Sequence, residues 1–470
     1  MIKKYTTAII ALLSIVLLSC AKKDNPVNSA WHKADEIVKS IVKPKFPDKS
    51  FDVLDFGAIA DSTYNSNRAF TEAIEKCSAD GGGTVVVPTG VYFSAGPIKL
   101  LDNVRFHLED GAVINFSTEP SDYLPVVLSR WEGVELYNYS ALIYANGADN
   151  IALTGKGVLN GKASAENWWP WKGKTEYGFE EGMPSQLDPP GRPKLLNMNN
   201  TDAPLETRIF GEGSYLRPNF FQTIDCKNIL IEDVKFVDSP MWFINPVLCE
   251  NITVRGITVV GKGPNNDGLD PESCKNVLIE DCFFDTGDDC IAIKSGRNND
   301  GRRINVPSEN IVIRNCTMHD GHGGIVMGSE ISGGCKNVFA ENCLMDSPNL
   351  DRALRIKTNF FRGGSVENIY LRNITVGEVK EAIVKINLNY DIKNESGDKF
   401  LPSVKNVYLT DIKSSKSKHA FFLEGLEDSN IKNVGIFNSE LNGVEQESIL
   451  HHVINFETEN VKVNGKQFNN

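Results

Sequence analysis

Four short polar motifs in the second half of the chain hold residue types that could perform acid–base chemistry. They are Asn265-Asn-Asp267-Gly, Gly287-Asp288-Asp289, Gly321-His322-Gly323 and Arg355-Ile-Lys357. Hydrolysis of a glycosidic bond needs one protonated carboxyl group for the leaving oxygen and one carboxylate that activates water. Three crowded carboxyl groups meet this need, because their repulsion raises the pKa of one of them. The two basic residues are suited to bind a carboxylate on the substrate.

The motifs follow a repeated phrase in which Asn precedes an aliphatic, a variable and a mostly apolar residue. Clear copies begin at Asn228, Asn251, Asn276, Asn310, Asn337, Asn368 and Asn406, and weaker ones at Asn103, Asn150 and Asn460. Asp267 lies 16 residues after Asn251, Asp288 12 after Asn276, His322 12 after Asn310, and Lys357 20 after Asn337. A single Asp-Gly or Asp-Asp is usually a turn. Because all four motifs follow the first strand of their repeat, stacking of the repeats would gather them into one patch.

The repeat predicts short strands, because apolar residues alternate within it and Gly, Asn and Asp interrupt the chain between copies. The copies from Asn228 to Asn337 are separated by 23, 25, 34 and 27 residues. This pattern predicts an all-β fold, a right-handed parallel β-helix whose coils stack about 4.8 Å apart, with the Asn side chains hydrogen-bonded along a ladder. A β-sandwich is disfavoured, because it usually shows turn signals every ~8–12 residues.

Two segments depart from the repeat. Residues 67–78 form a predicted short helix within 51–116, and this region is suited to cap the open end of the solenoid. Residues 161–218 are a long insertion that contains Trp168, Trp169 and Trp171. Clustered aromatic residues in such an insertion either stack on sugars or pack against the solenoid, and the sequence leaves both interpretations open.

The N-terminus predicts export. Lys3 and Lys4 precede an apolar run that is too short to cross a membrane, and Leu17-Leu18-Ser19-Cys20 resembles a bacterial lipobox. Residues 1–20 are therefore interpreted as a lipoprotein signal peptide with lipid attached to Cys20, and residues 21–50 as a tether with one short helix at 34–42. Residues 51–465 are expected to form a single catalytic domain. The expected location is the outer membrane, on its periplasmic or cell-surface face.

Charge and cysteine content limit the partners. The formal net charge is −12, which disfavours nucleic acid and requires that basic residues gather at the site if the substrate is anionic. Nine cysteines follow Cys20, and most fall at fixed offsets from the repeated Asn. We expect mostly free, buried thiols, because side chains that point in parallel suit a disulfide poorly. No Cys-x-x-Cys pair occurs, which disfavours a structural metal.

The motifs Asn-Asn-Asp-Gly, Gly-Asp-Asp-Cys, Gly-His-Gly and Arg-Ile-Lys resemble the signatures of glycoside hydrolase family 28, the polygalacturonases. Cap and coils extend the resemblance over about residues 51–465. Asn266 departs from the Thr that is common in the family, at a position not expected to carry protons. The resemblance implies a pectin-lyase-like solenoid that hydrolyses α-1,4-galacturonosyl bonds of homogalacturonan with inversion, without a cofactor or metal.

The resemblance also implies roles for individual residues. Asp288 would be the general acid, and Asp267 with Asp289 would activate water. His322 would tune the acid or bind nearby. Arg355 and Lys357 would hold the galacturonate carboxylate, and Asn265 would contact the substrate.

The mode of cleavage and some alternatives stay open. Exo-action is favoured over endo-action, because the insertion at 161–218 and the segment 124–133, with Arg130 and Trp131, could wall off one end of the groove. A rhamnogalacturonan or xylogalacturonan hydrolase of the same family is the first alternative; the intact His-Gly and Arg-x-Lys motifs disfavour it. A calcium-dependent pectate lyase and a non-catalytic glycan-binding β-helix are further alternatives. A monomer is expected.

Overall fold

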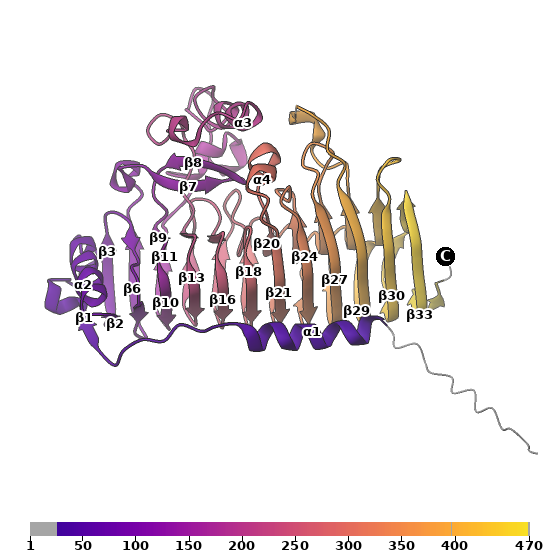
Figure 1. The fold of residues 1–470 in the computed structure, drawn as a ribbon, viewed down its shortest axis with the longest axis horizontal. Coiled ribbons are helices and arrows are strands. Elements are labelled where there is room, and N and C mark those ends of the chain that lie inside the picture. Colours follow the sequence, from indigo (N-terminus) through magenta and orange to yellow (C-terminus); the bar gives the residue numbers. More distant parts are fainter. Residues whose placement is uncertain (1–25, 396, 469–470) are drawn as a thin grey trace, which may run out of the picture.

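The protein is a long solenoid of parallel strands (Figure 1). The computed structural model describes residues 26–395 and 397–468, so the predicted signal peptide and Cys20 lie outside the described residues. Each coil contributes up to three strands, and equivalent strands of successive coils pair in parallel. The predicted parallel β-helix is confirmed.

The first ladder begins each coil and carries the repeated Asn. Its strands are β1 (Ser50–Asp52), β2 (Gly83–Val87), β5 (Val104–Leu108), β10 (Asp149–Gly155), β13 (Lys227–Glu232), β16 (Glu250–Arg255), β18 (Lys275–Glu280), β21 (Ser308–Arg314), β24 (Cys335–Glu341), β27 (Ser365–Glu378), β29 (Ser403–Glu424), β30 (Ile431–Leu441) and β33 (Val453–Val463). Isoleucine and valine stack along its inner side, as at Ile252, Val277 and Ile311, which are fully buried. β34 (Lys466–Gln467) closes this ladder antiparallel to β33.

The predicted Asn ladder is confirmed. The Nδ2 group of each ladder Asn donates to Oδ1 of the Asn one coil before it, at 2.9–3.4 Å. All of these residues have φ between 56° and 62°, a left-handed conformation that Asn tolerates better than most residues. One assignment was wrong: the ladder continues through Asn433 and Asn455, whereas Asn460 pairs with Asn438 in a separate row.

The second and third ladders complete the coils. The second consists of β3 (Gly90–Ser94), β6 (Ala112–Phe116), β11 (Val158–Asn160), β14 (Lys235–Val237), β17 (Thr258–Gly261), β19 (Phe283–Thr286), β22 (Thr317–Met318) and β25 (Leu344–Met345). The third consists of β4 (Ile98–Lys99), β9 (Ile143–Asn146), β12 (Phe221–Ile224), β15 (Ile244–Val247), β20 (Ile291–Ile293), β23 (Ile325–Gly328), β26 (Arg352–Lys357), β28 (Ala382–Asn387), β31 (Val444–Gln446) and β32 (Ile449–His451). Leu269 bridges β15 and β20, which keeps the third ladder continuous.

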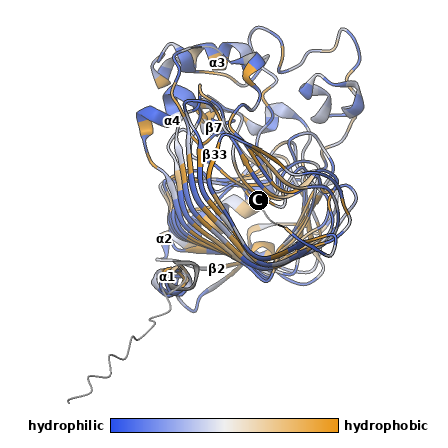
Figure 2. Ribbon diagram, turned by 90° about the vertical axis from the view of Figure 1, so that its right-hand side faces the viewer, coloured by the Kyte–Doolittle hydropathy of each residue, from blue (hydrophilic) through white to orange (hydrophobic). Residues whose placement is uncertain are grey.

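Two helices cover the solenoid. α2 (Asn67–Ala79) packs Phe70, Ala73 and Ile74 onto the first coils, so the predicted helix at 67–78 is confirmed to within one residue. α1 (Pro26–Ser40) lies along the outer face of the solenoid (Figures 1 and 2). The expected helix at 34–42 was therefore placed too late. Residues 26–40 are also not a free tether, because Trp31 and Ile37 bury themselves against Phe339 and its neighbours.

The insertion at 161–218 forms a lobe above the third ladder, beside the antiparallel hairpin of β7 (Val127–Trp131) and β8 (Val134–Asn138) (Figure 1). It contains α3 (Arg192–Asn200), which contacts α4 (Asn298–Ile304). The short 3₁₀ segments of the chain are η1 (Val53–Phe56), η2 (Pro120–Tyr123), η3 (Trp169–Lys172), η4 (Thr175–Tyr177), η5 (Leu205–Thr207) and η6 (Ile392–Asn394). Trp168 is buried, and Trp169 and Trp171 pack against the core, so this aromatic cluster anchors the lobe and does not offer sugar-stacking faces.

The nine cysteines after Cys20 are all free and buried, which confirms the expectation of packed thiols. Within residues 26–395 and 397–468, no helix has the length and apolar character needed to cross a membrane.

Candidate active site

The third ladder brings the four motifs together. Leu269, Ile291, Ile325 and Leu354 are register partners on successive coils. Asp267, Asp289 and Gly323 each lie two residues before such a partner, in the turn that leads into the strand. Arg355 and Lys357 lie on β26 itself. The four motifs therefore lie close together in space, because each occupies a similar place within its repeat.

The three carboxyl groups form one cluster. Oxygen atoms of Asp267, Asp288 and Asp289 all lie within 4.8 Å of one another. The Asp289 side chain is fully buried and pairs with Lys357 at 2.6 Å and Arg355 at 3.3 Å. The Asp267 side chain is 4% exposed, whereas that of Asp288 is 18% exposed. Asp288 is therefore the member of the trio that a substrate can most easily reach.

The environments of these groups move their pKa values apart. Burial and the negative charge of Asp288 raise the pKa of Asp267 well above its usual range. Burial also opposes the charge of Asp289, but Lys357 and Arg355 outweigh it and hold its pKa below the ordinary value. These shifts favour the protonated form of Asp267 and the ionised form of Asp289 at neutral pH.

Asp288 and His322 form a pair. Nδ1 of His322 lies 3.0 Å from Oδ1 of Asp288. Burial opposes the charge of Asp288, but the hydrogen bond and positive charge of His322 lower its pKa strongly. In return, the bond to Asp288 raises the pKa of His322 to about 9. At neutral pH the pair holds one proton, which rests on His322.

Neighbouring residues fix the turns that carry the acids. Asn266 is buried, and its Nδ2 donates to the carbonyl groups of Ser239 and Met241, both at 2.9 Å. Asn266 shapes the turn and lies away from the proton-transfer step, which explains why Asn can stand at this position in place of Thr. Gly323 allows close approach, since a Cβ atom at this residue would lie 2.6 Å from Val326 and 3.3 Å from Oδ1 of Asp289.

The acids open into a cavity of about 630 Å³. Nine lysine and arginine residues line it against six aspartate and glutamate residues. The basic residues are Lys172, Lys174, Arg192, Lys294, Arg297, Arg352, Arg355, Lys357 and Arg362. A cavity that is richer in cations than in anions, in a protein of net charge −12, meets the local requirement for an anionic substrate.

Both predicted wall segments reach this cavity. The insertion contributes Lys172, Gln186 and Arg192, and the 124–133 segment contributes Glu132. Arg130 and Trp131, which were expected to form that second wall, are buried and do not line the cavity. Their place in β7 next to β8 explains this, because the hairpin turns only Glu132 toward the site.

Sequence reasoning missed a group of buried charges beside the acids. Lys294, directly after β20, lies 3.6 Å from Oδ2 of Asp267 and 3.4 Å from Glu330. Its ammonium group also lies 4.5 Å from the ring centroid of Trp242. A lysine that follows Ile291-Ala-Ile in a fully buried strand was the available signal. Arg297, Arg362 and Glu395 extend this network and come from loops that no local pattern connects.

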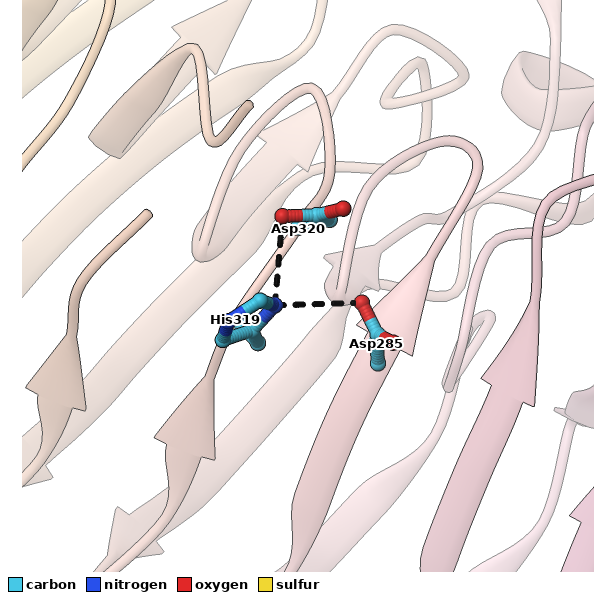
Figure 3. A group of neighbouring side chains, drawn as sticks. All are labelled: Asp285, His319 and Asp320. Carbon is cyan, nitrogen blue, oxygen red and sulfur yellow. Dashed lines mark hydrogen bonds and ion pairs between the residues drawn. The ribbon is translucent and has the colours of Figure 1, made fainter. Parts of the chain in front are cut away.

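A second acidic group lies on a neighbouring edge of the solenoid. Asp285, His319 and Asp320 approach one another, with Nδ1 of His319 3.3 Å from Asp285 and 3.2 Å from Asp320 (Figure 3). The ammonium group of Lys262 pairs with both aspartates. The positive charge of Lys262 thus already offsets the negative charge of Asp285 and Asp320. Lysine and arginine likewise contact the catalytic trio, and this donor set disfavours a bound calcium ion at either place.

Comparisons with known proteins agree with this geometry. The model of the family "Glycosyl hydrolases family 28" matches residues 211–461. A probable polygalacturonase of Vitis vinifera is 28% identical over 402 residues, covering 83% of this chain and 73% of that protein. An exo-poly-alpha-D-galacturonosidase of Dickeya chrysanthemi is 26% identical over 430 residues, covering 85% and 69%.

Solved structures extend the likeness. The hyperthermoactive exopolygalacturonase of Thermotoga maritima superposes with a TM-score of 0.89 at 46% identity, covering 93% of this chain and 97% of that one. The family 28 exopolygalacturonase of Yersinia enterocolitica has a TM-score of 0.73 at 22% identity, covering 90% and 76%, and shows the shared fold.

Proposed function

The chain belongs to the glycosyl hydrolases family 28, and from this membership we propose that it hydrolyses α-1,4-galacturonosyl bonds of homogalacturonan from one end of the chain. The observation that carries the proposal is the cation-rich cavity around three carboxyl groups in an otherwise acidic protein. A polyuronate supplies the negative charge that such a cavity lacks. A neutral polysaccharide would supply no negative charge to offset this excess of cations.

Asp288, backed by His322, is the general acid. It is the most exposed of the three aspartates, and its partner keeps a proton at hand at neutral pH. As negative charge develops on the leaving oxygen, the proton passes from the pair to that oxygen. The proton held by the Asp288–His322 pair thus reaches the leaving oxygen, where negative charge develops in the transition state.

Asp267 and Asp289 hold the attacking water. Asp289 is kept ionised by Lys357 and Arg355 and accepts the proton of the water, while Asp267 orients it. Arg355 and Lys357 also bind a uronate carboxylate at the open side of the cavity. Water attack opposite the leaving oxygen inverts the anomeric centre. The close approach of the three acids, within 4.8 Å, does not by itself decide the stereochemistry, which nuclear magnetic resonance of the first product anomer tests.

Exo-action is supported by the wall that the insertion builds. Lys172, Gln186 and Arg192 line the cavity, and we expect this wall to admit a terminal sugar and to stop a continuing chain. Two similar structures are named exopolygalacturonases, which agrees with this interpretation.

Substrate class is tested by the release of reducing ends from polygalacturonate, rhamnogalacturonan, xylogalacturonan and galactan, with and without a calcium chelator. We expect polygalacturonate to be hydrolysed whether or not the chelator is present. Preference for either branched pectin would assign the chain to another substrate. An ultraviolet-absorbing unsaturated product that disappears with chelator would indicate a lyase.

We also propose that the chain is a monomeric lipoprotein, anchored through Cys20 to the outer membrane. The support is the lipobox-like sequence and the short apolar run before it. Metabolic labelling with palmitate tests this: label should enter the wild-type chain, and the Cys20→Ala variant should carry none and leave the membrane fraction. Label in the Cys20→Ala variant would place the lipid elsewhere.

A further inference from the structure

Two cations from the insertion converge on one side-chain oxygen next to the catalytic acids. Nζ of Lys172 lies 2.7 Å from Oδ1 of Asn265, and Nη2 of Arg217 lies 2.9 Å from the same atom. Asn265 is two residues before Asp267 and lines the cavity together with Lys172. Because two donors face Oδ1, the Nδ2 group of Asn265 is turned away from them and remains a donor.

Neither cation has a carboxylate partner among the described residues. The other contacts of Arg217 are the carbonyl groups of Pro240 and Pro264 and the amide oxygen of Gln186. Burial lowers the pKa of Lys172 to about 8 and that of Arg217 to about 10. Buried positive charge without a counter-charge is unfavourable, so an anion that entered here would be stabilised.

The nearby carboxylate is already shared by other residues. Oε2 of Glu132 accepts from Nε of Arg192 at 2.7 Å and from Nη1 of Arg297 at 3.1 Å. Glu132 therefore already pairs with two arginines, and Lys172 and Arg217 add two further positive charges nearby. This excess of positive charge is built by the insertion and is separate from the Arg355–Lys357 pair.

The two cationic sites lie on opposite sides of the acid Asp288. The coil of Asn265 comes before the coil of Asp288, and β26 with Arg355 comes two coils after it. Three steps of about 4.8 Å separate the two sites along the solenoid axis, a span of roughly 14 Å. Sugars on both sides of the cleaved bond can thus each meet a cation.

We propose that Lys172 and the Nδ2 group of Asn265 bind the carboxylate of the terminal sugar that is released, with Arg217 as the positioning residue for Asn265. This rests on the proposed exo-acting function and deepens it. The enzyme then recognises a carboxylate on each of the two sugars that flank the cleaved bond. The ligand class is a uronate, held at the closed end of the cavity by side chains of the insertion.

The test uses trigalacturonate and an analogue in which only the released terminal sugar is a methyl ester. The wild type is expected to prefer the free acid in kcat/KM by about 10- to 100-fold, the range of a hydrogen-bonded charge pair. Lys172→Met should lose most of this preference. Lys194→Met is the matched control, because Lys194 lies exposed on α3 in the same insertion, over the ring of Phe210, and does not line the cavity.

Retained discrimination in a folded Lys172→Met variant would overturn the inference while leaving the proposed function intact. Lys172→Gln takes its place if Lys172→Met does not fold. A protein that does not hydrolyse trigalacturonate at all would remove the proposed function, and this inference with it. As a binding readout, D-galacturonate should raise the melting temperature of the wild type more than D-galactose does, and Lys172→Met should reduce the difference, whereas Lys194→Met should not.

Discussion

We propose that Asp288 transfers the proton to the leaving oxygen, because it alone of the trio is both partly exposed and paired with a proton carrier. We predict that Asp288→Asn lowers kcat by about 10²- to 10⁴-fold, since an amide cannot protonate the leaving oxygen. Substrate binding should change little. Steady-state kinetics with a separate binding measurement would show this, and turnover near that of the wild type in folded Asp288→Asn would remove Asp288 from this role.

We predict that His322 sets the alkaline limit of activity. Its pKa is raised to about 9 by Asp288, so the pair holds its proton below that pH and loses it as the pH rises through it. Activity should therefore fall with rising pH around 9. In His322→Gln, Asp288 must hold the proton alone, and the alkaline limb of kcat/KM should move to lower pH. An unchanged limb in that variant would show that another group supplies the proton.

The Asn ladder stabilises the solenoid at the scale of the element. Asn276 donates to Asn251 at 3.4 Å, accepts from Asn310 at 3.1 Å and has φ of 58°. Asn276→Ala should lower the free energy of unfolding by about 2–4 kcal/mol, through lost hydrogen bonds and a strained left-handed alanine. Asn276→Gly keeps the conformation without strain and should lose less. Denaturant titration compares the two, and equal losses would exclude backbone strain as a contributor.

α1 packs on the outer face of the solenoid. Trp31 packs edge-on against Phe339 at 5.6 Å between centroids, with Arg372 above its ring at 3.9 Å. Trp31→Ala should weaken this contact by about 3–5 kcal/mol and release the helix locally. Hydrogen exchange should therefore speed up in α1, while kcat/KM stays unchanged because the cavity lies elsewhere. Loss of activity would link α1 to the site.

The features that could be predicted from the sequence are those that follow from patterns within each repeat and from the stacking of the repeats. The coils, the cap helix and the gathering of Asp267, Asp288 and Asp289 follow from register, since residues at similar places within stacked coils become neighbours. Lys172, Arg217 and Glu132 could not be predicted, because an irregular insertion and the β7–β8 hairpin bring them to the site from outside the repeat. The roles of Trp168 and its neighbours stayed ambiguous for the same reason. Asn433 was missed although it begins an intact copy of the phrase, Asn433-Val-Gly-Ile, whereas Asn455 was missed because its copy, Asn455-Phe-Glu-Thr, ends in polar residues.

Charge is arranged on the scale of the whole molecule. The net charge is −12, yet basic residues outnumber acidic ones in the cavity. Salt screens both the attraction of the cavity and the repulsion of the acidic surface, but the short-range pairing in the cavity dominates binding. We predict that KM for polygalacturonate rises with ionic strength while kcat changes little. A KM that falls with salt would show that the acidic surface controls the approach of the substrate.

We propose that the insertion wall at Lys172 and Arg192 makes the molecule an exo-acting enzyme, and the products made from polygalacturonate test this most directly. Viscosity and reducing ends would be followed together, with Asp288→Asn as the inactive control. The structure predicts galacturonate or its dimer as the early product, with a slow fall in viscosity, because only a chain end fits beside Lys172 and Arg192. A rapid fall in viscosity with few reducing ends and a mixture of oligomers would contradict it.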